Sequence, residues 1–140
     1  MRIVLDTNVL VSGLLSPTGP PGRILDAVAA GAATVLHDDR ILAEYRDVLA
    51  RPRLRIEASE VAAVLDLLEW EGVLVSAPPL PVVLPDPSDL PFLEVAVAGG
   101  AAALVTGNGR HFVPVQGESA VPVLNPTTFL ALLRERALGS

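Results

Sequence analysis

Short runs of aliphatic and β-branched residues alternate along this chain with longer segments whose apolar positions recur every three or four residues. The short runs predict strands, and the longer segments predict helices. The expected strands are Arg2–Leu5, Thr34–His37, Val73–Ser76, Ala103–Thr106 and Val121–Leu124. Because helical patterns lie between most of these strands, we expect an α/β fold with a mainly parallel sheet covered by helices.

The helical segments have recognisable ends. A helix after Gly19 accepts Pro21 in its first turn, whereas the segment 77–91 contains too many prolines for a regular helix or a central strand. Pro91 must lie in the first turn of the helix that follows this connector. The remaining helical patterns occupy residues 38–50, 58–72 and 126–138.

Three acidic residues occupy positions that the pattern reserves for buried side chains. Asp6 stands where a buried strand meets a helix, and a carboxylate is costly to desolvate there. Glu44 falls on the apolar stripe of its helix, three residues after Ile41. Asp89 leads the apolar stripe of the next-to-last helix, whereas Glu94 and other acids would lie on solvated faces.

A fourth polar residue, Asn108, follows the strand that ends at Thr106. Ligands of open α/β sheets bind beyond the carboxyl ends of the strands. Asp6 and Asn108 come from such ends, and Glu44 and Asp89 can reach the same crevice from flanking helices. Converging carboxylates repel one another unless a cation joins them, and oxygen ligands favour Mg²⁺ or Mn²⁺.

The same residues allow ordinary structural interpretations. Asp6 and Asp89 are suitable helix N-caps, and Glu44 is suitable for a boundary position with its carboxylate in water. Asn108 lies between two glycines, as many turn residues do. Their joint occurrence favours a metal site.

Composition narrows the functional classes. The 140 residues fit a single domain, 1–140, and 51% of them are hydrophobic. A net charge of −6 argues against bulk attraction to nucleic acid or anionic membranes, although it leaves room for a local basic patch. Cysteine is absent, which excludes disulfides and thiolate metal sites. No signal peptide or membrane span is recognisable, so we expect a soluble, cytoplasmic protein.

Four segments together resemble the PIN-domain family, in the branch of putative toxins of toxin–antitoxin systems (VapC-like). They are LDTNVLVSGL, LAEYRDVLARPRL, DPSDLPFLEVAVAGGAAALVTGN and VPVLNPTTFLALL. They follow the order of the family and cover nearly the whole chain. The resemblance implies a three-layer α/β/α sandwich and an endoribonuclease that depends on Mg²⁺ or Mn²⁺.

Carried over by position, Asp6, Glu44 and Asp89 match the first three acids of the family and are the expected metal ligands. Asn108 takes a fourth position where many relatives have aspartate, and it completes the expected catalytic set. Asp86 is expected to shape a turn, and His111 is expected to be a surface residue. Thr7 and Thr106 are candidates to support the acids by hydrogen bonds.

The implied reaction is metal-assisted hydrolysis of an RNA phosphodiester, with Glu44 as a ligand through water or as the general base. The implied partners are an RNA substrate, an antitoxin protein and a second copy of the chain. Arginines between Arg40 and Arg55 are candidates for contact with flanking phosphates. The alternative is a catalytically weak PIN-like module that binds a protein or RNA, because Asn108 contributes no charge.

Overall fold

The computed structural model describes residues 1–115 and 121–139. Its core is a five-stranded sheet in the order β3-β2-β1-β4-β5, and all four strand pairings are parallel. The strands are β1 (Arg2–Leu5), β2 (Thr34–His37), β3 (Val73–Leu74), β4 (Ala103–Val105) and β5 (Val123–Leu124). The predicted α/β fold is confirmed, although the last three strands are shorter than the sequence pattern indicated.

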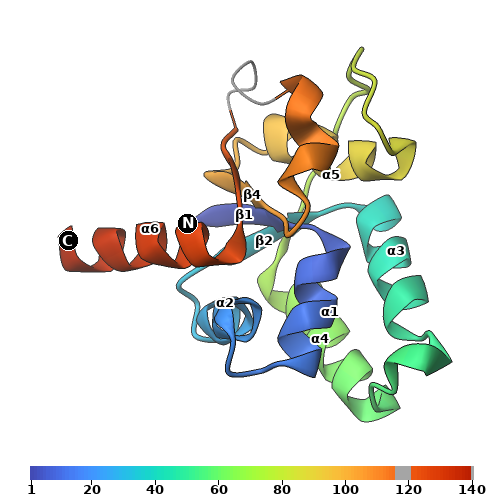
Figure 1. Cartoon of the computed structure of the whole chain (residues 1–140), viewed down its shortest axis with the longest axis vertical. Helices are drawn as coiled ribbons and strands as arrows, with labels where there is room; N and C mark the ends of the chain where they lie inside the picture. Colours follow the sequence, from blue (N-terminus) through green and yellow to red (C-terminus); the bar gives the residue numbers. More distant parts are fainter. Residues whose placement is uncertain (116–120, 140) are drawn as a thin grey trace.

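Helices cover both faces of the sheet and complete three layers (Figure 1). α5 packs over β1, β2 and β4 on one face, while α4 and α6 contact the other. The helices are α1 (Thr7–Leu15), α2 (Pro20–Ala29), α3 (Asp39–Leu49), α4 (Ala58–Glu71), α5 (Leu90–Ala98) and α6 (Pro126–Gly139). Three 3₁₀ segments are η1 (Pro52–Leu54), η2 (Pro87–Asp89) and η3 (Gly109–Val115). Among the described residues, no helix is long and apolar enough to cross a membrane.

The order of the strands places a crevice at the carboxyl ends of β1 and β4. The chain adds β2 and β3 on one side of β1, and then returns to add β4 and β5 on the other side. Connections leave such adjacent strands in opposite directions, which opens a space between them where α/β proteins bind ligands. The amide of Asp6 donates to the carbonyl of Val105 across this point at 2.9 Å.

The buried faces agree with the apolar patterns. Ile3, Val4 and Leu5 are fully buried, as expected for a strand that helices cover on both sides. α5 begins at Leu90, one residue before Pro91, and the side chain of Phe92 on this helix is buried as predicted.

The expectation that Glu94 is solvated is wrong. Glu94 is 3% exposed, because the proline-rich connector covers the face of α5 that the periodicity assigns to solvent. Its carboxylate accepts a hydrogen bond from the Leu80 amide at 2.8 Å and pairs with Arg40 at 2.7 Å. Arg40 also pairs with Asp38, which caps α3 by accepting from the Ile41 amide. Glu94 therefore joins α5, α3 and the connector.

Replacing Glu94 with alanine is expected to lower the free energy of unfolding by about 2–3 kcal/mol, because the partly buried Leu80 amide loses its acceptor and Arg40 loses a buried partner. Urea denaturation of the wild type and the variant measures this loss. Glu69→Ala is the matched control, because Glu69 and its partner Arg46 are both exposed, and such pairs are worth less than about 1 kcal/mol. Equal losses in the two variants would contradict the assigned role of Glu94.

Candidate functional site

Asp6 lies at the junction of β1 and α1 and is 5% exposed. It occupies the N-cap position of α1, but its side chain makes no capping hydrogen bond. Instead, the hydroxyl of Thr106, at the end of β4, donates to Asp6 Oδ2 at 2.7 Å. The interpretation of Asp6 as a simple helix cap is therefore not supported, and Thr106 has the supporting role that the sequence suggested.

Glu44 reaches the same place from α3. Its carboxylate accepts a hydrogen bond from the hydroxyl of Thr7, which follows Asp6 in the chain. The next residue, Tyr45, is fully buried and donates its hydroxyl to the Leu5 carbonyl at 2.5 Å. These two contacts fix the middle of α3 against the end of β1, so Glu44 cannot turn to bulk solvent without breaking the first of them.

Asp89 approaches from the opposite side, where η2 ends and α5 begins, and is 7% exposed. Its side chain makes no capping hydrogen bond either. Its Oδ2 lies 3.1 Å from Nδ1 of His111 in η3. The side chain of His111 is 38% exposed, which agrees with the expected surface position, but its contact with a site carboxylate was not predicted. Phe92, one turn after Asp89, packs its ring 6.1 Å from that of Tyr45 and so connects α5 to α3.

Electrostatics indicate that the three acids share one environment. Burial raises the pKa of Asp6, Glu44 and Asp89 above their ordinary values, and the pKa of Asp89 reaches about 6. The charge of Asp6 is a further cause of the raised pKa of Glu44 and of Asp89. The structure therefore brings together carboxylates that are 38 and 45 positions apart in the sequence.

Asp86 adds a fourth negative charge that the sequence analysis assigned only to a turn. It does shape that turn, because its carboxylate accepts from the amide and hydroxyl of Ser88 at 3.0 and 2.8 Å. These hydrogen bonds hold the pKa of Asp86 below its ordinary value. The resulting charge contributes to the raised pKa of Asp6, Glu44 and Asp89, so Asp86 belongs to the electrostatics of the site.

Asn108 lies at the exposed rim of the site. Its backbone amide donates to the Thr106 hydroxyl at 3.0 Å, which links it to Asp6 through one intervening group. Asn8 is a contributor that the sequence analysis missed: its Oδ1 accepts from the Gly107 amide at 3.2 Å, and its Nδ2 donates to Asp6 at 3.4 Å. The sequence signal for Asn8 was its place two residues after Asp6, on the first turn of a helix.

The family model described as PIN domain matches residues 2–110, and so includes every residue of this site except His111. The chain belongs to the PIN-domain family. Uncharacterized protein MJ1680 of Methanocaldococcus jannaschii is 28% identical over 128 residues, which cover 89% of this chain and 81% of that protein.

A solved structure is also similar to this PIN domain: the crystal structure of VapBC2 from Rickettsia felis bound to a DNA fragment from their promoter. It superposes with a TM-score of 0.59 at 17% identity, over 89% of this chain and 98% of the other. At that identity the likeness shows a common fold, and it confirms the predicted PIN-like sandwich.

The donor groups of this PIN domain suit a hydrated, hard divalent ion. In residues 1–115 and 121–139, no three His, Cys, Asp or Glu side chains are grouped closely enough to hold one metal ion directly. Mg²⁺, however, keeps several waters and needs only one or two carboxylates from a protein. The available groups are carboxylate, amide and hydroxyl oxygens whose mutual repulsion a cation would relieve. Asp6 and Asp89 are therefore suitable direct ligands, with Glu44 as a ligand through water.

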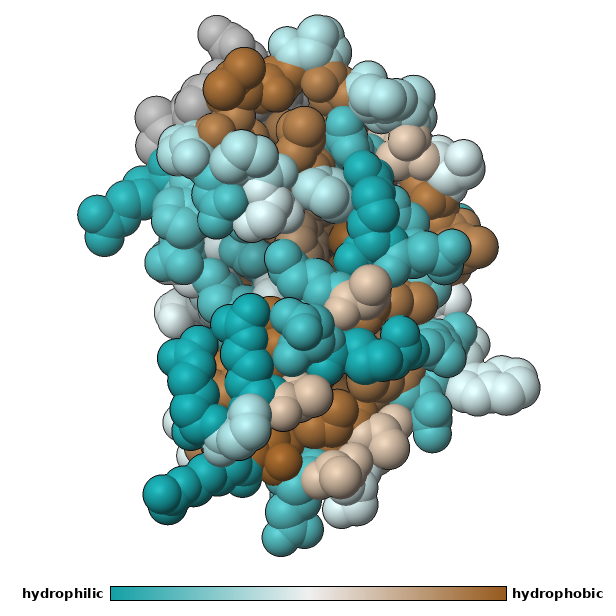
Figure 2. Space-filling view, turned by 90° about the vertical axis from the view of Figure 1, so that its right-hand side faces the viewer, coloured by the Kyte–Doolittle hydropathy of each residue, from teal (hydrophilic) through white to brown (hydrophobic). Residues whose placement is uncertain are grey.

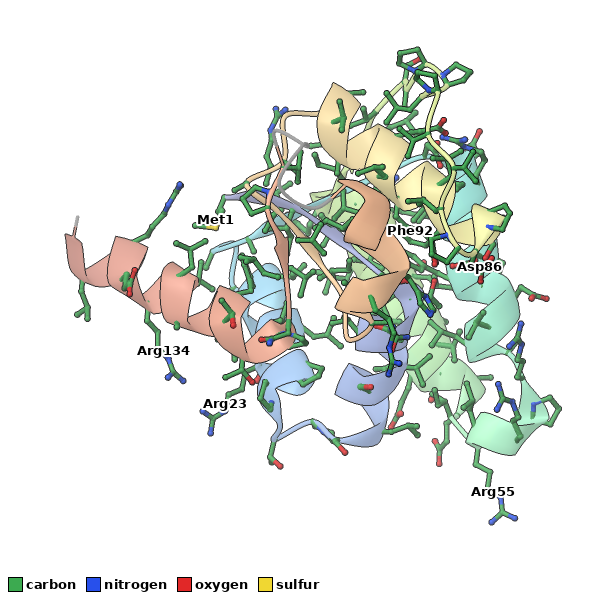
Figure 3. The ribbon with its side chains drawn as sticks, turned by 45° about the horizontal axis from the view of Figure 1, so that its top comes forward. Met1, Arg23, Arg55, Asp86, Phe92 and Arg134 are labelled. Atoms are coloured by element: carbon green, nitrogen blue, oxygen red, sulfur yellow. The ribbon has the colours of Figure 1, made fainter. Side chains whose placement is uncertain are left out.

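Of the arginines after α3, Arg51 lies near enough to Glu44 for its charge to offset part of the raised pKa of that acid, whereas Arg55 lies far from Asp86. Figure 3 shows Arg55 at the end of α3 opposite to Asp86, with its side chain extended into solvent. Arg51 pairs with Asp47 on α3 at 3.5 Å. Contact between this segment and phosphates next to the cut remains a prediction, and it requires a substrate that extends along α3.

In metal-free buffer, we expect Asp89 to make the PIN domain less stable as pH rises. The folded state holds the Asp89 proton up to about pH 6, while the unfolded chain releases it near 3.8. Unfolding therefore releases a proton in this interval, and the free energy of unfolding falls across it by up to about 3 kcal/mol. Urea denaturation in EDTA at pH 4 and pH 7 measures the change.

Asp89→Asn removes this titration, so its stability should exceed that of the wild type at pH 7 and vary less between the two pH values. The exposed Asp26 of α2 provides the control substitution Asp26→Asn, which should leave the pH dependence unchanged. A clear loss of stability in Asp89→Asn at pH 7 without metal would show that Asp89 is not destabilised by its neighbours.

Proposed function

We propose that this PIN domain is a metal-dependent endoribonuclease that hydrolyses RNA phosphodiester bonds. The observation that carries the proposal is electrostatic: Asp6, Glu44 and Asp89 come from three separate segments, and burial raises the pKa of all three. The charge of Asp86 raises each of these pKa values further, and the charge of Asp6 does so for Glu44 and Asp89. Acids with perturbed pKa values that lie near one another are typical of functional sites. A divalent cation and a phosphate group explain why they are kept together.

In this proposal, Asp6 and Asp89 hold a Mg²⁺ or Mn²⁺ ion. The bound ion supplies positive charge for the scissile phosphate and for the departing oxygen. Glu44 accepts the proton of the attacking water, and its raised pKa brings it closer to the range of an effective general base. Thr7 orients the Glu44 carboxylate, and Thr106 orients Asp6. Asn108 positions water or substrate at the rim through its amide.

The chain's own charges support the need for a cation. The charge of Asp86 acts on Asp6, Glu44 and Asp89, and an RNA phosphate that approached these four carboxylates would be repelled by them in the absence of an ion. His111 is the basic group that contacts the cluster through Asp89. We assign it the role of fixing the orientation of the Asp89 carboxylate, which would help to hold an ion.

We further propose that the nuclease is the toxin of a toxin–antitoxin pair. The R. felis structure that shares the fold is described as VapBC2 bound to promoter DNA, which supports this assignment. A groove of about 500 Å³ between α3 and α4 offers a protein partner an apolar floor that includes Leu49, Ile56 and Leu65. Figure 2 shows brown atoms between hydrophilic side chains on this side of the molecule.

A non-catalytic interaction module is the second candidate function. The exposed amide of Asn108 favours it, because this position adds no charge to the metal site where many PIN relatives have an acid. A module of this kind would retain the fold and the partner surface but would bind divalent ions too weakly for hydrolysis.

The nuclease proposal predicts that the purified protein cleaves structured RNAs with Mg²⁺ or Mn²⁺ and not with EDTA. Asp6→Asn keeps the size of the side chain and removes its charge, so the cleavage rate should fall by at least about 100-fold. Gel analysis of end-labelled RNA measures the rate. The control Asp26→Asn places the same substitution on an exposed helix and should retain wild-type activity.

The same assay separates the two candidate functions. Asn108→Asp adds a further negative charge at the rim of the site, and it should strengthen activity that the wild type already shows. Cleavage that appears only in Asn108→Asp would favour the interaction module for the natural chain. Activity that persists in EDTA, or equally in Asp6→Asn, would overturn the proposed mechanism.

A further inference from the structure

A small pocket adjoins the acidic site on the side away from Glu44. Its volume is about 270 Å³, and it lies between the first turns of α1, the start of α2, the loop after β4 and the start of α6. Asn8 and Asn108 line it, so it shares two residues with the site. Asn8 also donates to Asp6, which places the pocket one side chain away from the carboxylates.

The lining of this pocket combines hydrogen-bonding groups with short apolar walls. Asn8, Ser12 and Asn108 provide two amides and a hydroxyl, while Pro21 and Pro126 provide apolar surface. Amides and hydroxyls both donate and accept hydrogen bonds. The hydrogen bonds of Asn8 to Gly107 and Asp6 hold its amide in one orientation, so the pocket presents a fixed polar pattern before any ligand binds.

The charge of the lining residues restricts the class of ligand that this pocket can bind. Among the described residues, none that lines the pocket is charged, although four carboxylates lie beyond Asn8. A phosphate would find no cationic partner among these residues, and a metal ion would find no carboxylate. The volume is at the lower end for a small-molecule site, which suits one planar group rather than a larger ligand. A nucleobase is neutral and flat, and its edge carries both donors and acceptors.

We propose that this pocket binds the base of the nucleotide next to the cleaved phosphodiester and so gives the nuclease its preference for that nucleotide. The inference rests on the proposed function, because it takes RNA as the substrate. The amides of Asn8 and Asn108 recognise the edge of the base, as asparagine side chains do in other nucleic-acid complexes. Ser12 stands on the exposed side of α1, where its size decides how much of the pocket is open.

The first test uses the wild-type protein in EDTA, so that no cleavage takes place. Its ¹⁵N–¹H spectrum is recorded during titration with AMP, GMP, CMP and UMP, and with ribose 5-phosphate as the control without a base. We expect the signals of Asn8, Gly107 and Asn108 to shift more with at least one nucleotide than with ribose 5-phosphate. Equal shifts with ribose 5-phosphate, or no shifts with any nucleotide, would overturn the proposal.

The second test fills the pocket by the substitution Ser12→Tyr. Its matched control is Ser59→Tyr, on the exposed surface of α4. Fluorescence anisotropy with a labelled, non-hydrolysable single-stranded RNA analogue in Mg²⁺ should show a Kd at least 10-fold higher for Ser12→Tyr and a change of less than 2-fold for Ser59→Tyr. In Mg²⁺, Ser12→Tyr should raise KM more than it lowers kcat and should alter the positions of cleavage.

Circular dichroism confirms that each variant is folded, and Ser12→Gln serves as a smaller replacement if tyrosine prevents folding. A folded Ser12 variant that binds and cleaves RNA like the wild type would overturn the proposal that this pocket binds a base. Failure of the nuclease proposal gives a different result: no RNA is cut in Mg²⁺ or Mn²⁺, while the nucleotide-induced shifts of Asn8 and Asn108 persist.

Discussion

Repulsion among carboxylates that are withdrawn from water is the constraint around which this PIN domain is organised. Asp6 is almost fully buried at the centre of the sheet edge, and its charge opposes the ionisation of Glu44 and Asp89. Each acid is held by a neighbour: Thr106 for Asp6, Thr7 for Glu44 and His111 for Asp89. These contacts come from different segments, so the arrangement depends on the whole fold.

The topology explains how distant segments meet. Reversal of strand order at β1 places the ends of β1 and β4 side by side, with α3 and α5 on either side of the crevice. The Tyr45 hydroxyl donates to the Leu5 carbonyl and so anchors α3 to β1. The contact between the rings of Tyr45 and Phe92 joins α3 to α5. Beyond the crevice, the ion pair and hydrogen bond of Glu94 hold the connector against α5. The core thus holds the acids in place against their repulsion.

Periodic patterns in the sequence predicted the strands and helices, whose own geometry is periodic. The first two strands, the place of Pro91 in the first turn of α5 and the inward positions of Asp6 and Asp89 followed from periodicity and from proline chemistry. The burial of Glu94 did not follow from periodicity, because periodicity assumes that one face of a helix is solvated. Every face of α5 near Glu94 is covered. The contact of His111 with Asp89 joins η3 to the start of α5, and the contact of Asn8 with Gly107 joins α1 to the loop after β4. Neither pairing is encoded by a spacing along the chain, because the partners are far apart in sequence.

The central claim is that one divalent cation is shared by the clustered acids. The most direct test is a crystal grown with Mn²⁺, in which anomalous scattering locates the ion. The account predicts a peak within about 2.0–2.6 Å of an oxygen of Asp6 or Asp89, with water completing the shell towards Glu44. An ordered crystal at millimolar Mn²⁺ with no peak in this crevice would contradict the claim.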